Sequence, residues 1–326
     1  MIHSLRLLAL CAATTTILGA PARAAETSNG AVFSFQIEND APMQIDRHYT
    51  NGLRFAWLTT PLKPERAGRW AGALLPFTDS GADVRFDFVL GQNLFTPRHL
   101  HDLVPDPTEW PFAAWLYLNA GIVAETADVR DQFYANIGIV GPAALGEETQ
   151  SLLHHAKVPG WQYQLRGEPT FGVQYRRTWR AWRSDGGWLD FDALPYLGLS
   201  LGTAHVYGEG GLMLRLGQDL PHDFGPSLGD PGLPGSTPFD TDAPFAWYLF
   251  AALDARVSAH DMFLDGGTFR KGPSLDSRTV TGDARFGFVV LWNDVRLTGA
   301  YVLRADQFRG QVGDDAFASL TLSFRM

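Results

Sequence analysis

Alternation of apolar and polar residues is clearest over Val84-Arg85-Phe86-Asp87-Phe88-Val89-Leu90. Every second side chain from Val84 to Leu90 is apolar, whereas Arg85 and Asp87 place charges on the opposite side of the chain. Successive side chains of a β-strand point to opposite faces, so this period of two predicts a strand with one apolar and one polar face. The same alternation returns over residues 320–326.

Twelve stretches of this kind follow one another along the chain. They span residues 31–39, 50–60, 83–93, 112–124, 131–140, 169–181, 187–201, 208–216, 244–258, 277–291, 294–305 and 315–326. Most are close to the roughly 9–11 residues that a tilted strand needs to cross a bilayer, and an even number brings both chain ends to one side. The pattern predicts an all-β fold, a twelve-stranded antiparallel transmembrane β-barrel with a short helix in an outer loop.

A soluble β-sandwich is the alternative, because its strands also alternate while hiding one face in a core. The polar faces of the predicted strands carry charges in mid-strand, at Arg54, Asp87, Arg176 and Arg285. Such charges are costly on a solvent-excluded sandwich face. In the lumen of a barrel they can pair with one another, which favours the barrel.

The composition narrows the possible classes of protein. The chain has 326 residues, with 26 Lys and Arg against 35 Asp and Glu, for a formal net charge of −9. Charged residues make up 19% and aromatic residues 13%, which excludes intrinsic disorder. Because acidic residues outnumber basic ones, no excess of cations is available for phosphates, which argues against a nucleic-acid-binding protein. Mean hydropathy is −0.08, and beyond the N-terminus no run of about 18 apolar residues predicts a transmembrane helix.

The N-terminus predicts export from the cytoplasm. Residues 1–24 read as a signal peptide, with Arg6 near the start, an apolar core over 7–20 and small residues at the end. Residues 25–326 are expected to form one outer-membrane β-barrel domain. The single cysteine, Cys11, lies in the signal, so no disulfide is expected in the mature domain. Closing a large sheet on itself leaves no open edge and supplies stability in another way.

The predicted strands also assign the loops to the two sides of the membrane. If the first strand rises from the periplasm, residues 40–49, 94–111 and 141–168 are outer loops. The long connection over residues 217–243 then falls on the periplasmic side, where barrel turns are usually short. Either further strands lie in this region or the barrel is atypical there.

Residues 141–157 break the alternation and are rich in Ala, Leu, Glu and Gln, which favour a helix. Gln150 and His154 are four residues apart, so they share a face of this helix. Because histidine titrates near neutral pH, His154 is a candidate general base. The alternative is a loop histidine with no catalytic role.

Several motifs occur in a characteristic order. They read Phe35-Gln36-Ile37-Glu38-Asn39-Asp40 with Tyr49-Thr50-Asn51-Gly52-Leu53, then Gly91-Gln92-Asn93-Leu94-Phe95-Thr96-Pro97, then Trp110-Pro111-Phe112-Ala113-Ala114-Trp115-Leu116-Tyr117-Leu118, and finally Gly138-Ile139-Val140-Gly141-Pro142, Gln150-x-x-x-His154, Gly160-Trp161-Gln162-Tyr163-Gln164-Leu165 and Glu168-Pro169. In this order the motifs resemble the lipid A deacylase family, outer-membrane enzymes that remove the 3′-linked acyloxyacyl chain of lipid A. The resemblance covers about residues 31–216 by motif and the rest by general pattern.

The resemblance implies a lipid A 3′-O-deacylase-like ester hydrolase whose active site lies at the outer rim, between the barrel wall and the loop helix. It implies that His154 deprotonates a water molecule that attacks the ester carbonyl. It also implies a calcium ion, held by Asp40 and other oxygen ligands, that neutralises the oxyanion. Asn39 or Thr50 would add a ligand or a hydrogen bond, and Gln150 would orient His154 or the water.

Two positions depart from the family pattern. Trp110 stands where an arginine is common, and the residues after His154 lack the acidic residue that some members carry. Glu168 is the nearest replacement as a second carboxylate for calcium. The resemblance further implies a lipid A or lipopolysaccharide substrate and a place in the bacterial outer membrane, and a monomer is expected. The alternatives are an outer-membrane channel, a phospholipase acting on glycerophospholipids and a catalytically inactive barrel of the same family.

The predicted outer loops also carry basic residues, which form a candidate phosphate-binding patch for lipid A. They are Arg47, His48, Arg98, His99, His101, Lys157 and Arg166. The alternative is an ordinary solvated loop surface.

Overall fold

The computed structural model describes residues 30–40, 48–75, 81–154, 158–184, 187–227, 235–239, 243–313 and 315–326. It leaves aside the side chains of Pro64, Ala71, Gly72, Leu153 and His154. The predicted signal peptide, residues 1–24, and the predicted start of the barrel domain at residue 25 lie outside the described residues.

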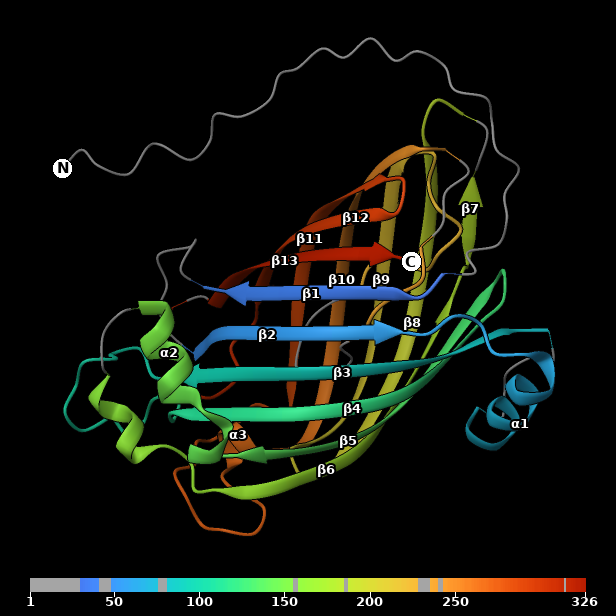
Figure 1. The fold of residues 1–326 in the computed structure, drawn as a ribbon. Coiled ribbons are helices and arrows are strands. Elements are labelled where there is room, and N and C mark those ends of the chain that lie inside the picture. Colours follow the sequence, from blue (N-terminus) through green and yellow to red (C-terminus); the bar gives the residue numbers. More distant parts are fainter. Residues whose placement is uncertain are drawn as a thin grey trace.

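Twelve long antiparallel strands in the described part of the chain form a closed barrel (Figure 1). They are β1 (Val32–Asn39), β2 (His48–Leu58), β3 (Asp83–Thr96), β4 (Ala113–Glu125), β5 (Val129–Val140), β6 (Glu168–Trp179), β8 (Asp190–Gly202), β9 (His205–Gln218), β10 (Phe245–Asp261), β11 (Val280–Trp292), β12 (Val295–Arg304) and β13 (Asp315–Arg325). β1 pairs with β13, β6 pairs with β8, and the three-residue β7 (Trp182–Ser184) extends the edge of β8. All twelve predicted strands are confirmed.

Short helices lie at both ends of the barrel. They are α1 (Pro64–Leu74), the 3-10 helices η2 (Pro142–Ala144) and η3 (Pro159–Tyr163), α2 (Gly146–His154) and α3 (Met262–Asp265). The helix predicted over residues 141–157 is confirmed by α2, and residues 155–157 lie outside the described residues. No helix in the described ranges is long and apolar enough to cross a membrane.

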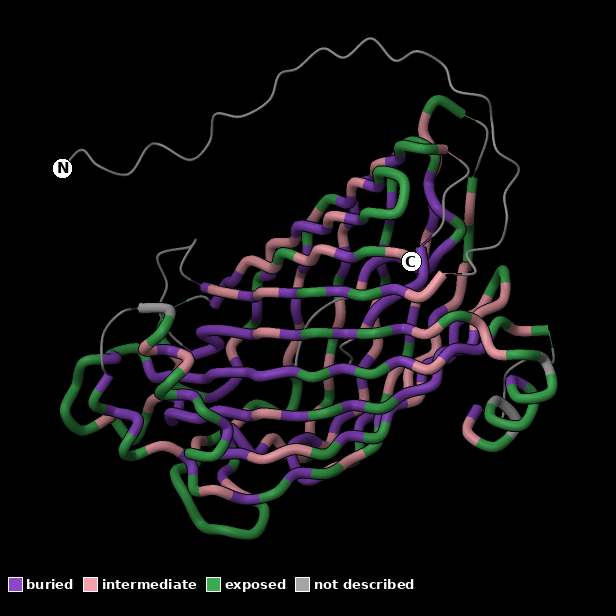
Figure 2. Tube along the Cα trace, viewed as in Figure 1, coloured by how far each residue is buried: buried purple, intermediate pink, exposed green. Residues whose placement is uncertain are grey.

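Burial alternates along the strands, as Figure 2 shows. The outward side chains are large and apolar, and Phe35 and Phe55 remain 39% and 58% exposed although they sit in mid-strand. The inward side chains are polar and paired. Arg54 binds Glu38 at 2.9 Å, and Arg176 binds Glu209 at 2.5 Å. A sandwich would bury the apolar face and expose the polar one, so the sandwich alternative is wrong.

Ala31, which precedes β1, and Met326 lie at the same end of the barrel, since Ala31 N donates to Met326 O at 2.9 Å. The β9–β10 connection starts at this end and folds back into the lumen. Ser236 Oγ donates to Ser34 Oγ of β1 at 2.8 Å, and Phe224 and Phe239 belong to a buried cluster with inward-facing wall residues. In its described part, residues 219–227 and 235–239, the connection therefore adds no strand and packs inside the lumen.

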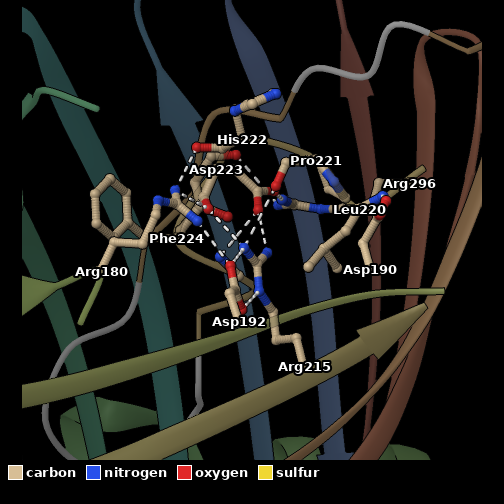
Figure 3. Close-up of polar contacts among 12 residues, drawn as sticks. Arg180, Asp190, Asp192, Arg215, Leu220, Pro221, His222, Asp223, Phe224 and Arg296 are labelled. Atoms are coloured by element: carbon tan, nitrogen blue, oxygen red, sulfur yellow. Dashed lines mark hydrogen bonds and ion pairs between the residues drawn. The ribbon is translucent and has the colours of Figure 1, made fainter. Parts of the chain in front are cut away.

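An ion-pair cluster holds this connection in place (Figure 3). Arg215 of β9 binds Asp223 of the connection and donates to both carboxylate oxygens of Asp192 on β8, at 2.9 and 2.5 Å. Arg180 also binds Asp192, at 2.7 Å, and donates to the backbone oxygens of His222 and Asp223. Two cavities beside the connection enclose only about 10 and 20 Å³, about the space of one water molecule each.

Candidate active site at the outer rim

The hairpin of β1 and β2 brings the first predicted site residues together. Asn39, the last residue of β1, pairs with Asn51 of β2, and Asn39 Nδ2 donates to Thr50 O at 3.1 Å. Asn39 has the same strand parity as Phe33 and Phe35, which face outward, so it lies on the outer face of the barrel. Asp40 follows directly and is 1% exposed.

A β-bulge sets the geometry at Thr50. The register between β2 and β3 shifts between Tyr49 and Asn51, so Thr50 is the extra residue. Bulges bend a strand, re-aim its side chains and are frequent beside active sites. Tyr49 points into the lumen, where its hydroxyl donates to Glu38 Oε2 at 2.6 Å. Gly52 leaves room for the Tyr49 side chain. A Cβ at position 52 would lie only 2.2 Å from the Tyr49 hydroxyl.

Two polar side chains beside the bulge complete this part of the rim. Thr50 Oγ1 is hydrogen-bonded to Thr96 Oγ1 of β3 at 2.5 Å, and both residues are buried. Asn51 is 2% exposed and its Nδ2 donates to Glu38 O at 3.1 Å, but its Oδ1 has no hydrogen-bond partner among the described residues. A buried amide oxygen without a partner is unusual in a native structure and marks a possible ligand position.

The α2 segment covers the outward faces of β3 and β4 next to this rim. Gln92 of β3 donates to Ala144 O at 2.6 Å, and Trp161 packs with Phe112 in a buried cluster. α2 begins close to the wall, because a Cβ at Gly146 would lie 2.5 Å from the Trp161 ring and 2.6 Å from Ala114 Cβ. In Figure 1 the helix runs across the outer strand ends from the β4 side toward β1.

Gln150 faces the barrel from α2. It is 2% exposed, and its Oε1 accepts from Trp161 Nε1 at 2.5 Å. Its Nε2 has no hydrogen-bond partner among the residues that the structure describes. His154 is the last residue of α2, one helical turn after Gln150, so its position lies on the same side of the helix. The side chain of His154 lies outside what the structure describes.

Glu168 lies on the same rim at the start of β6, with four strands between it and β1. Its carboxylate is buried and accepts hydrogen bonds from three consecutive backbone amides. These are Thr268 N at 2.7 Å, Phe269 N at 3.0 Å and Arg270 N at 2.9 Å. Glu168 thus anchors the β10–β11 loop, and Asp40 supplies the carboxylate that stands beside Asn39 and Thr50.

The oxygen atoms that Asp40 and its neighbours in the hairpin carry are of the kind that bind a hard cation. Asp40 offers a carboxylate, Asn51 a buried amide oxygen without a partner, and Thr50 a hydroxyl. Calcium prefers such oxygen ligands and tolerates irregular geometry. A group of three or more His, Cys, Asp or Glu side chains able to hold a metal is not found among the described residues. A calcium site here would therefore rest on one carboxylate and several neutral oxygens, which predicts weak affinity.

His48 does not belong to an exposed phosphate-binding patch. It is 1% exposed, and its two ring nitrogens contact Asp315 Oδ1 at 2.7 Å and Glu109 Oε2 at 3.2 Å. The hydrogen bond from His48 lowers the pKa of Glu109, and the positive charge of protonated His48 acts in the same direction. Trp110, at the position that departs from the family pattern, stacks between His48 and Phe95.

The other members of that predicted patch divide into two groups. Four are exposed, which agrees with either a phosphate site or a solvated surface: Arg98, His99, His101 and Arg166. Arg47 and Lys157 lie outside the described residues.

Three residues at the site were not singled out from the sequence. They are Asn51, Thr96 and Trp161, which contact or adjoin the predicted residues Asn39, Thr50 and Gln150. All three lie inside the ordered motifs, so the motifs contained the signal. Alternation alone could not find them, because their roles depend on the bulge and on the packing of α2 against the wall.

Comparisons with known proteins agree with this architecture. A family model described as outer membrane protein LpxR matches residues 7–326. The structure of LpxR from Salmonella typhimurium superposes with a TM-score of 0.76 at 17% sequence identity, covering 90% of this chain and 100% of that one. This likeness shows the fold. No curated protein sequence matches the chain significantly.

Two further barrels are much less similar. The translocator domain of the autotransporter NalP from Neisseria meningitidis has a TM-score of 0.39 at 11% identity, covering 94% of this chain and 91% of that one. The TodX monoaromatic hydrocarbon channel deltaS2 mutant has a TM-score of 0.38 at 8% identity, covering 91% and 90%. Neither carries an argument about this chain.

Proposed function

Because this chain belongs to the LpxR family of outer membrane proteins, we propose that it is an ester hydrolase that removes the 3′-linked acyloxyacyl chain of lipid A. The observation that carries this proposal is the contact between Asn39 and Thr50 on the outward face of the barrel, beside the wall that α2 covers. Polar groups on the outward side of the barrel lie next to membrane lipid, whereas polar groups in the lumen would meet water-soluble solutes.

The proposed chemistry uses this chain's own residues. His154 takes a proton from water, and the resulting hydroxide attacks the ester carbonyl carbon; the proton then passes to the leaving oxygen. Asn39 and Thr50 position the substrate at the rim, and Gln150, held by Trp161, orients His154 or the water. Asp40 and Thr50 would hold calcium. When bound, calcium supplies positive charge against which the developing oxyanion is stabilised.

The buried state of Gln150 supports its positioning role. Its Oε1 accepts from Trp161, and its Nε2 has no acceptor within the described part of the chain. A donor buried without a partner costs about 1–3 kcal/mol, which is recovered when a substrate or water oxygen accepts from it. Gln150 Nε2 is therefore a hydrogen-bond donor available at the rim, one helical turn before His154.

Mass spectrometry of lipid A from cells expressing the protein tests the proposal. Wild type should remove the 3′ acyloxyacyl mass, and His154→Ala and Asp40→Ala should each leave lipid A intact. His222→Ala, which changes an exposed histidine of the β9–β10 connection, is the matched control and should behave as wild type. Heat-dependent gel mobility shows that each variant is folded. If folded wild type leaves lipid A unchanged, the proposal fails.

A further inference from the structure

Three cations lie at the outer rim beside β6, away from the candidate active site. Arg166 precedes β6, and Arg270 and Lys271 lie in the β10–β11 loop. All three are exposed, and none forms an ion pair with a described acidic residue. Exposed cations that form no ion pair attract anions, and phosphates in particular.

The two segments that carry these cations are joined to each other. Glu168 accepts from the backbone nitrogens of residues 268–270, and Gly272 lies against Leu165, where a Cβ would stand 3.5 Å from Leu165 Cδ2. Thr268 Oγ1 also donates to Thr203 O at 2.7 Å. These contacts hold the backbone of the loop in place, so little ordering of the main chain is needed to bind a ligand.

The nearest acidic side chains of the loop have partners of their own. Asp265 pairs with His260 at 3.5 Å and accepts from Ser277 at 2.5 Å, and Asp276 pairs with Arg309 at 3.3 Å. The positive charge of Arg270 and its neighbours therefore stays available to a ligand.

An apolar surface continues from the cations along the outer wall. Phe269 is 57% exposed and its ring centroid lies 6.0 Å from that of Phe171, which faces outward from β6 and is 53% exposed. Val173 and Leu201, which pair across β6 and β8, are 39% and 49% exposed on the same face. Cations above a column of exposed apolar side chains match a lipid with an anionic head and acyl chains.

We propose that this surface, formed by Arg166, Phe171, Phe269, Arg270 and Lys271, binds lipid A phosphate and acyl chains of a lipopolysaccharide molecule in the outer leaflet. The α2 segment packs on β3 and β4, between this surface and the rim of β1 and β2. The bound molecule is therefore separate from the one that would be hydrolysed. The inference rests on the location of the barrel in the outer membrane and not on the proposed hydrolysis.

A local fluorescent probe tests the proposal. Because the only cysteine of the chain is Cys11 in the predicted signal peptide, Ser274→Cys provides a single labelling position at the exposed loop. The labelled full-length barrel, in phosphatidylcholine nanodiscs, is titrated with bisphosphorylated lipid A. A saturable change in fluorescence is expected, and Arg270→Ala/Lys271→Ala should weaken the apparent affinity at least fivefold.

The controls separate this site from others. Arg66→Ala/Arg69→Ala removes two exposed arginines of α1 at the periplasmic end and should leave the affinity within twofold of wild type. Lipid A without phosphates should bind wild type at least fivefold more weakly. The assignment would be overturned if the loop double variant bound lipid A as tightly as wild type. It would also be overturned if wild type bound phosphatidylglycerol as tightly as lipid A. The probe reports binding whether or not the protein hydrolyses lipid A, so the two proposals fail independently.

Discussion

Asp40 is 1% exposed at the end of β1, next to the outward-facing Asn39 and close in the hairpin to Thr50 and Asn51. The neighbouring hairpin residues offer neutral oxygen atoms beside a single carboxylate residue, so a divalent cation held there would gain modest electrostatic energy. At the level of single residues, this site differs from the calcium-binding loops of soluble proteins, which supply several carboxylates. A site with one carboxylate is expected to bind calcium weakly, with a dissociation constant of about 0.1–1 mM, as in extracellular calcium-binding modules.

Calcium should stabilise the barrel through Asp40. A ligand that binds the folded state alone adds about 2.7 kcal/mol at one hundred times its dissociation constant. We expect millimolar calcium chloride to raise the unfolding temperature of wild type, and Asp40→Asn to abolish that shift. Asp102→Asn, at an exposed aspartate of another outer loop, is the matched control and should keep it. An equal shift in Asp40→Asn would rule out this calcium site.

The contact of Glu109 with His48 should make the 97–112 loop sensitive to acid. The hydrogen bond from His48 lowers the pKa of Glu109 below its ordinary 4.5. A carboxylate with a lowered pKa stabilises the fold above its unfolded pKa, and this contribution is lost as pH falls through the folded value. After correction for the intrinsic pH dependence of amide exchange, the protection factors of the loop should therefore be high at pH 7 and should fall as the pH drops below 4.5, the ordinary pKa of glutamate. Glu109→Gln should exchange faster already at pH 7, and unchanged protection would contradict the role of the contact.

At the scale of elements, α2 depends on a close approach to the wall. Gly146 begins the helix where a Cβ would lie 2.5 Å from the Trp161 ring and 2.6 Å from Ala114 Cβ. Gly146→Val should push α2 outward and disturb the bond between Gln150 and Trp161. Overpacking of this kind costs about 1–3 kcal/mol. We expect a loss of lipid A deacylation of at least tenfold with the barrel still folded.

The matched control for this change is Gly68→Val in α1, where a Cβ would meet no atom within 4 Å. Both variants place valine in a short helix on the outer wall, so they share the cost of valine in a helix. Gly68→Val should keep deacylation near the wild-type level. If Gly146→Val also keeps full activity, the position of α2 does not matter for the reaction.

An element could be predicted from the sequence when the pattern that forms it lies within its own residues. The twelve strands are visible in the sequence because a wall with lipid outside and polar groups inside forces a period of two on every strand. α1 was not predicted, although Ala67 and Leu74 repeat at helical spacing and pack on the wall. Its segment is short and carries three glycines or prolines, Pro64, Gly68 and Gly72, which weaken the helical signal.

The site shows the same division. Asn39, Thr50 and the helix with Gln150 could be located from the ordered motifs, and the structure joins Asn39 to Thr50 directly. The use of Glu168 to hold backbone amides of the β10–β11 loop could not be predicted, since those residues lie about one hundred positions away. Long-range contacts of this kind leave no periodic trace in the sequence.

At the scale of the whole molecule, the lumen behaves as a polar core. Arg54, Arg176 and Arg215 each bind an inward-facing carboxylate, and the β9–β10 connection adds Asp223 to the same network. Buried charges of this kind are costly alone and stable when paired. The barrel therefore resists collapse through paired charges inside, while its apolar wall meets lipid. The same arrangement disfavours the channel alternative, because the connection occupies the space that solutes would need.

This filling of the lumen predicts the electrical behaviour of the barrel. Wild type in planar bilayers should show little ion conductance, because Asp223 ties the connection to Arg215 and lies 3.6 Å from Arg296. Asp223→Asn should remove the acidic partner that Arg215 and Arg296 share and lower the free energy of unfolding by about 3–5 kcal/mol. In planar bilayers this variant should show discrete channel-opening events. Asp219→Asn, at an exposed aspartate of the same connection, is the control and should stay closed. Steady conductance by wild type would instead indicate an open pore and would favour transport over hydrolysis.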